Sequence, residues 1–132
     1  MIKEMKRESV VFKIDLDRWN LRKAERMVKF RLRWIDYYFN LFPCRVSFYR
    51  THKGYHVYVA CLRYIEMKPE RIIIIQSCLC SDWLREIRNL NRIKDGMTKN
   101  WNLAFTAKFK VNARGELQYV SKERFMKSII LE

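Results

Sequence analysis

The chain has 132 residues, 49% of them hydrophobic, so we expect one domain, residues 1–132, with a single substantial core. The 28 Lys and Arg residues outnumber the 14 Asp and Glu residues, which gives a net charge of +14. Polyanions are the natural partners of such a surface, and nucleic acid leads because phosphate neutralisation releases counterions. The N-terminus lacks a signal-peptide core and no apolar run approaches a bilayer span, so we expect a cytoplasmic protein without a membrane partner.

The first predicted elements are a strand and a long helix. Alternating apolar residues indicate a half-buried strand from Ser9 to Asp17, and apolar residues spaced by three and four indicate a helix from about Asn20 to Leu41. The helix carries a second apolar stripe roughly opposite the first, which needs a partner of its own. We therefore expect a homodimer through this second stripe, formed by Met27, Phe30, Trp34 and Tyr37.

A hairpin follows, with strands at 44–50 and 55–62 around the turn 51–54, where Gly54 suggests a positive φ. If Arg50 pairs with Tyr55, the numbers of any two facing residues add up to 105. This register places apolar residues opposite each other on one face. The same register places Cys44 opposite Cys61, and whether they form a disulfide stays open.

The second half is predicted in less detail. Residues 70–80 fit either a buried helix or a strand, and Ser81 is a candidate N-cap for a helix that runs to about Lys94. Alternation predicts a strand over residues 101–111, followed by a short strand and a helix from Ser121. The predicted fold is an α+β two-layer sandwich, with a mainly antiparallel sheet of four to five strands and helices packed on one face.

The outer face of this sheet suits single-stranded nucleic acid. Bases stack on aromatic rings while Lys and Arg contact phosphates, and duplexes hide their base faces. Plain cross-strand packing of the tyrosines and a merely solvated arginine face are the alternatives. The predicted nucleic-acid-binding residues are Lys13, Tyr49, Arg50, Lys53, His56, Tyr58, Arg85, Arg92 and Lys108.

Two motifs carry a family resemblance over roughly residues 45–110. They are Lys53-Gly54-Tyr55-His56-Val57, and the set Asp82, Arg85, Arg92 and Gly96 followed by Asn102-Leu103, Phe105 and Lys108. Together they resemble the ThermoDBP-like family of archaeal, viral and plasmid single-stranded DNA-binding proteins. The resemblance implies single-strand binding in replication, recombination or repair, usually as an oligomer and without a cofactor.

A weaker similarity points to an enzyme. Asp15-x-Asp17 at a strand end, followed by a helix and a hairpin with Gly54 and His56, resembles the first two motifs of archaeo-eukaryotic primases. That similarity implies a metal-dependent nucleotidyltransferase or nuclease, in which the two aspartates hold a divalent metal ion. A third carboxylate is expected on a later strand, and residues 101–111 offer none. Alternatively Asp17 or Asn20 only caps the helix.

We assign no catalytic, metal or cofactor residues and favour binding without chemistry. The four cysteines have no CxxC pair and no histidines at zinc-ligand spacing, which argues against a zinc site. A structural or protein-interaction module is a third possibility. The choice between DNA and RNA stays open, because no residue can be singled out that would recognise the 2′-hydroxyl group of RNA.

Overall fold

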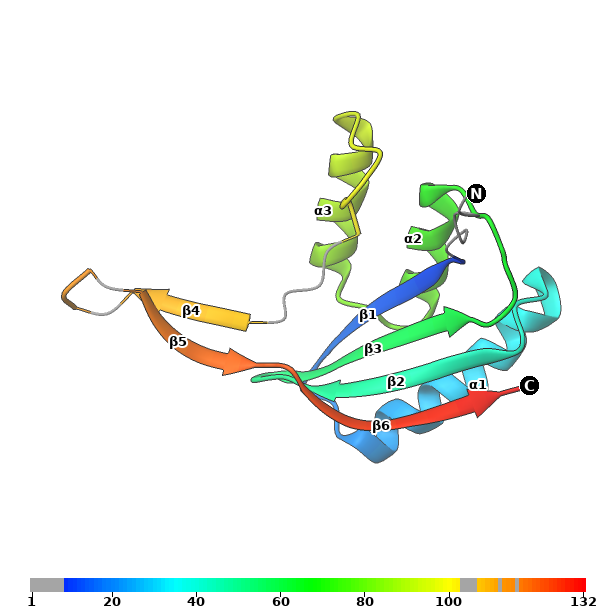
Figure 1. Cartoon of the computed structure of the whole chain (residues 1–132), viewed down its shortest axis with the longest axis horizontal. Helices are drawn as coiled ribbons and strands as arrows, with labels where there is room; N and C mark the ends of the chain where they lie inside the picture. The colour runs from blue at the N-terminus through cyan, green and yellow to red at the C-terminus, as the bar shows by residue number, and fades with distance from the viewer. Residues whose placement is uncertain (1–8, 103–106, 112, 116) are drawn as a thin grey trace, which may run out of the picture.

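A computed structural model describes residues 9–102, 107–111, 113–115 and 117–132, without the side chains of 107–111 and 117–122. The chain contains both strands and helices, grouped rather than strictly alternating, and has the α+β class that the sequence predicts (Figure 1). The elements are β1 (Val11–Asp17), α1 (Leu21–Phe39), β2 (Cys44–Arg50), β3 (Gly54–Cys61), α2 (Pro69–Cys78), α3 (Trp83–Lys94), β4 (Ala107–Val111), β5 (Leu117–Lys122) and β6 (Arg124–Leu131).

The main sheet has four antiparallel strands in the order β1-β3-β2-β6. The predicted hairpin register is confirmed, since Arg50 lies opposite Tyr55 and Cys44 lies opposite Cys61. The two cysteines are free thiols with their Sγ atoms 3.9 Å apart. Strands β4 and β5 form a separate two-stranded sheet, which extends away from the main sheet and leads into β6 (Figure 1).

Helix α1 lies along one face of the sheet and encloses the core (Figure 1). The side chain of Asn20 accepts a hydrogen bond from the Lys23 N–H at 2.8 Å, so Asn20, one of the two predicted candidates, is the N-cap. The predicted core stripe is confirmed and packs against inward residues of the strands. Its buried residues are Ala24, Val28, Leu32 and Ile35.

Helices α2 and α3 lie along the β1 edge of the sheet instead of beside α1 (Figure 1). The Gln76 side chain accepts from the Lys13 N–H at 2.8 Å, and the Ser81 hydroxyl accepts from the Asp15 N–H at 3.1 Å. The Asp82 N–H donates to the Asp15 carbonyl at 2.8 Å. The segment joining α2 to α3 therefore takes the place of a further strand, and the helices divide between one face and one edge.

Two predicted helix features change in the structure. The ambiguous segment 70–80 is helical, as α2. Helix α3 is capped by Asp82, whose carboxylate accepts from the Arg85 N–H at 3.1 Å, so the predicted cap at Ser81 is wrong. Ser81 lies one residue before the cap, and its hydroxyl accepts a hydrogen bond from the backbone of β1 instead of capping the helix.

The predicted helix from Ser121 is also wrong, because this segment forms the end of β5 and the whole of β6. Strand β6 pairs with β2 and buries Leu131 against the core. Its Lys, Arg and Met residues favour helices in isolation, but pairing satisfies the backbone groups of β2 that a helix would leave bare.

Gly54 is required for a reason other than the predicted positive φ. Among the described glycines, Gly96 and Gly115 have positive φ, and Gly54 does not. A Cβ on Gly54 would lie 1.9 Å from the carbonyl oxygen of Leu16. The missing side chain thus lets β1 approach β3 closely at this end of the sheet.

Candidate nucleic-acid interface

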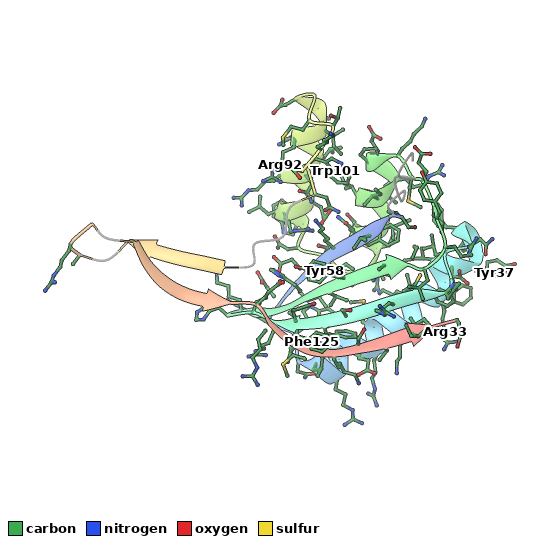
Figure 2. The ribbon with its side chains drawn as sticks, in the orientation of Figure 1. Arg33, Tyr37, Tyr58, Arg92, Trp101 and Phe125 are labelled. Carbon is green, nitrogen blue, oxygen red and sulfur yellow. The ribbon has the colours of Figure 1, made fainter. Side chains whose placement is uncertain are left out.

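Three aromatic rings from three adjacent strands form a row on the outer face of the sheet. Tyr49 of β2 lies between Tyr58 of β3 and Phe125 of β6, with ring centroids 5.2 Å and 5.4 Å away and both pairs edge-on. Phe125 is 55% exposed and the tyrosines are half-buried. We call these residues the aromatic row; two of them are labelled in Figure 2. The outward orientation predicted for Tyr49 and Tyr58 agrees with this geometry.

One exposed cation shares the outer face of the sheet with the aromatic row. Arg45 points to the same face of β2 as Tyr49 by strand alternation. Arg124 directly precedes Phe125 but pairs with Arg50, so its side chain leaves β6 on the opposite face from the ring. Neither arginine belongs to the predicted set. Of the two, Arg45 is the one placed to contact the phosphates of a nucleic-acid strand stacked on the rings.

The predicted Arg50 and Lys53 lie at the hairpin end of the sheet. Arg50 is exposed, and its guanidinium carbon lies 5.1 Å from the ring centroid of buried Tyr55, a cation–π contact on the inner side. Lys53 is exposed in the turn, and its carbonyl accepts from the Arg18 N–H at 2.7 Å. Both cations therefore lie beside the outer face and not on it.

His56 is buried, contrary to the prediction that it faces solvent. Its ring is 4% exposed and lies between Glu123, 3.0 Å from Nδ1, and Asp15, 3.6 Å from Nε2. The Tyr58 hydroxyl donates to the same Glu123 carboxylate at 2.8 Å. Burial, together with this hydrogen bond, raises the pKa of Tyr58. Glu123 closes over the histidine, so His56 offers no exposed ring for a base.

A buried polar cluster joins α3 to β1, and it includes Arg85, which was predicted to contact phosphates. Arg85 is 7% exposed, pairs with Glu86 and donates to the Lys13 carbonyl at 2.8 Å, so its placement on a solvated face is wrong. Burial lowers the pKa of Arg85, opposed by the Glu86 carboxylate. The cluster consists of Gln76, Ser81, Arg85, Glu86, Asn89 and Asn102.

The remaining predicted residues lie around this cluster. Lys13 is half-buried, and its ammonium group donates to the Asn102 carbonyl at 3.1 Å. Burial and the charge of Arg85 lower the pKa of Lys13. Arg92 is half-buried and donates to the Asn89 side chain at 2.8 Å, next to Trp101 (Figure 2). Lys108 lies in β4, and its side chain is outside the described residues.

A hollow of about 590 Å³ opens beside Lys13, between β1, the segment before α2 and the segment after α3. Trp101 and Asn102 form one wall, and Tyr64 and Met67 lie on the other. The hollow combines apolar rings with amide and ammonium groups, which is the composition of sites that take planar polar molecules such as bases.

Asp15, His56 and Glu123 come together, and Asp17 is exposed at the end of β1, on the same face of the strand as Asp15. Within the ranges that the structure describes, no three His, Cys, Asp or Glu side chains are arranged to hold a metal ion.

Glu123 and Phe125 were missed at the sequence level. The period-two spacing of Lys127, Ile129 and Leu131 was an available signal for strand β6. It would have placed Phe125 on the inner face, because the register shift opposite Phe48 and Tyr49 that turns Phe125 outward is not visible in the sequence.

No family model, curated protein or solved structure matches the chain. In the described part of the chain, no helix has both the length and the apolar character needed to cross a membrane.

Proposed function

We propose that this protein binds single-stranded nucleic acid inside the cell, with the aromatic row as the stacking platform. The observation that carries the proposal is the placement of Tyr58, Tyr49 and Phe125 side by side across three strands of a chain with a net charge of +14. Bases stack on such rings, and Arg45 contacts the phosphates. The resemblance to ThermoDBP-like proteins supports the same function in replication, recombination or repair.

Single strands are favoured over duplexes because stacking needs base faces that a duplex keeps covered. Phe125 is the most exposed ring of the row and makes the first contact. The half-buried tyrosines present less ring surface, and their edge-on contacts hold them in place. Binding by stacking and phosphate contact requires no cofactor and no base sequence.

The test is a titration with single- and double-stranded oligonucleotides at two salt concentrations. We expect tighter binding of the single strand, weakening as salt rises. Phe125→Ala should weaken single-strand binding at the aromatic row about tenfold. Met126→Ala is the matched control, since Met126 is the exposed neighbour of Phe125 in β6. Equal affinity for both forms of DNA, or equal effects of the two substitutions, would refute the proposal.

The second candidate is a metal-dependent nucleotidyltransferase or nuclease that uses Asp15 and Asp17. The observation that favours it is Glu123, which supplies beside His56 the further carboxylate that residues 101–111 lack. Against it, Glu123 is engaged by Tyr58 and His56, and among the described residues no three His, Cys, Asp or Glu side chains are arranged to hold a metal ion. Magnesium-dependent primer synthesis or strand cleavage that Asp15→Asn abolishes would replace the binding function with this one.

A further inference from the structure

The solvent-facing side of α1 carries aromatic and basic side chains in alternation. Phe30, Trp34 and Tyr37 are 66%, 57% and 78% exposed. At about 100° per residue, these aromatics and three exposed cations of the helix fall within one arc of roughly 100°, opposite the core stripe. We call this set the outer α1 surface: Lys23, Arg26, Phe30, Arg33, Trp34 and Tyr37.

The acidic residues of α1 do not neutralise this surface. Glu25 lies outside the arc and pairs with Lys29 at 3.0 Å and with Lys127 at 2.9 Å. Hydrogen bonds from these two lysines lower the pKa of Glu25. Asp36 also lies outside the arc, and its carboxylate accepts from the backbone N–H groups of Leu41 and Phe42, both at 2.7 Å. The positive charge of the arc is therefore left for an external partner.

We propose that the outer α1 surface is a second binding site for single-stranded nucleic acid, distinct from the aromatic row. The proposal rests on the function proposed above. A single strand offers both groups that the surface can use, since phosphates attract the arginines and bases stack on the aromatic rings. Arg26 and Arg33 lie on the same arc as Tyr37, so one nucleotide can meet a cation and a ring together.

A second copy of this chain fits the surface less well. Of the four residues predicted to form a homodimer, Met27 is half-buried and packs against the core. A symmetric contact through the remaining three would set the arginines of two chains, each with a net charge of +14, against one another. Like charges brought together oppose association, whereas a polyanion removes the repulsion.

The two sites lie on opposite sides of the molecule. Helix α1 packs on the inner face of the sheet, and the aromatic row lies on the outer face. Figure 2 shows Arg33 and Tyr37 of α1 well apart from Tyr58 and Phe125. One molecule therefore binds two segments of single strand at once, either from one long strand or from two separate strands.

The test counts oligonucleotides bound per chain, using an oligothymidine of about eight nucleotides, short enough to occupy a single site. We expect two per wild-type chain. Combined Trp34→Ala and Tyr37→Ala substitutions should weaken the α1 site at least about tenfold and leave one oligonucleotide bound at the same concentrations. Phe125→Ala should remove the other one. Trp83→Ala is the control, because Trp83 is a 70% exposed tryptophan on α3.

The outcomes separate the two proposals. No binding by the wild-type chain at low salt would refute the proposed function itself. One oligonucleotide per wild-type chain, unchanged by the Trp34→Ala and Tyr37→Ala pair, would overturn the α1 site and leave the sheet site standing. Sedimentation showing a wild-type dimer that this pair converts to a monomer, with unchanged oligonucleotide binding per chain, would assign the surface to a second copy instead.

Discussion

The aromatic row and the outer α1 surface have similar composition but differ in how firmly their side chains are held. In the row, the Tyr58 hydroxyl donates to Glu123, and Tyr49 touches a ring on each side. On α1, Phe30 and Trp34 are more than half exposed. Ordered rings lose little conformational freedom on binding, whereas exposed ones adapt to the ligand at an entropic cost. Substitutions should therefore affect folding on the sheet side and only binding on the helix side.

The largest effect should come from Glu86→Ala, which removes the partner of buried Arg85 at the β1 edge of the sheet. We expect the free energy of unfolding to fall by about 3–5 kcal/mol, because the guanidinium is left buried without its carboxylate. Urea denaturation followed by circular dichroism measures the change. Glu70→Ala, at an exposed position in the first turn of α2, should cost less than about 1 kcal/mol. Equal losses would mean that the buried pair does not anchor α3.

Tyr49→Ala should have the next largest effect. It removes both edge-on ring contacts of the row, each worth about 0.5–1.5 kcal/mol, so the free energy of unfolding should fall by about 1–3 kcal/mol. Tyr49→Phe keeps the ring and should remain close to the wild type. Chemical denaturation of the three proteins side by side checks this. A stable Tyr49→Ala protein would show that the row is as loosely held as the α1 aromatics.

Tyr58→Phe should have a smaller, pH-dependent effect. The pKa of Tyr58 is higher in the folded chain than its ordinary value of about 10. Its neutral hydroxyl therefore stabilises the fold fully below pH about 10, and this stabilisation is lost as the pH rises through the folded pKa. At pH about 8, loss of the hydrogen bond to Glu123 should cost about 1 kcal/mol.

The pH dependence itself is the check on that prediction. We expect the stability of the wild type to fall more steeply than that of Tyr58→Phe above pH about 10. Urea unfolding midpoints at several alkaline pH values measure both slopes. Parallel curves for the two proteins would mean that the Tyr58 hydroxyl ionises equally readily in the folded and unfolded chains.

Phe30→Ala should have the smallest effect on folding. Phe30 is 66% exposed, and Ala is the better helix former, so the free energy of unfolding should change by less than about 0.5 kcal/mol. Phe12→Ala provides the contrast, because Phe12 is fully buried and its loss should cost about 3–5 kcal/mol. Thermal melts compare the two variants. A large loss at Phe30 would show that another segment covers the outer α1 surface.

Local pattern was enough to predict the hairpin and the core face of α1. A four-residue turn and alternating apolar residues leave one sensible register for β2 and β3, and the outward tyrosines follow from it. Strand β6 was not predictable in this way, because residues such as Lys127 and Met126 favour helices. Its conformation depends on pairing with β2, where Ser47 and Ser128 meet across 81 positions of sequence.

The errors in the predicted site have the same origin. His56 is buried by Glu123, which lies 67 positions later in the chain. Arg85 is drawn inward by the carbonyl of Lys13, 72 positions earlier. An outward position in a strand or helix indicates exposure only when no distant segment folds over it. For that reason the predicted site contained two tyrosines that do lie on the outer face and also two residues that face the interior.

The capping of β1 by α2 and α3 makes the two edges of the main sheet unequal. A strand from another chain can join a sheet only where backbone N–H and C=O groups are free. Along β1 the side chains of Gln76 and Ser81 already occupy such groups, whereas β6 is the other terminal strand in the described part of the chain. Addition of a strand from another molecule to the main sheet is therefore confined to its β6 edge. Two molecules joined through β6 would leave no open edge in the main sheet, which opposes the growth of that sheet into a fibril.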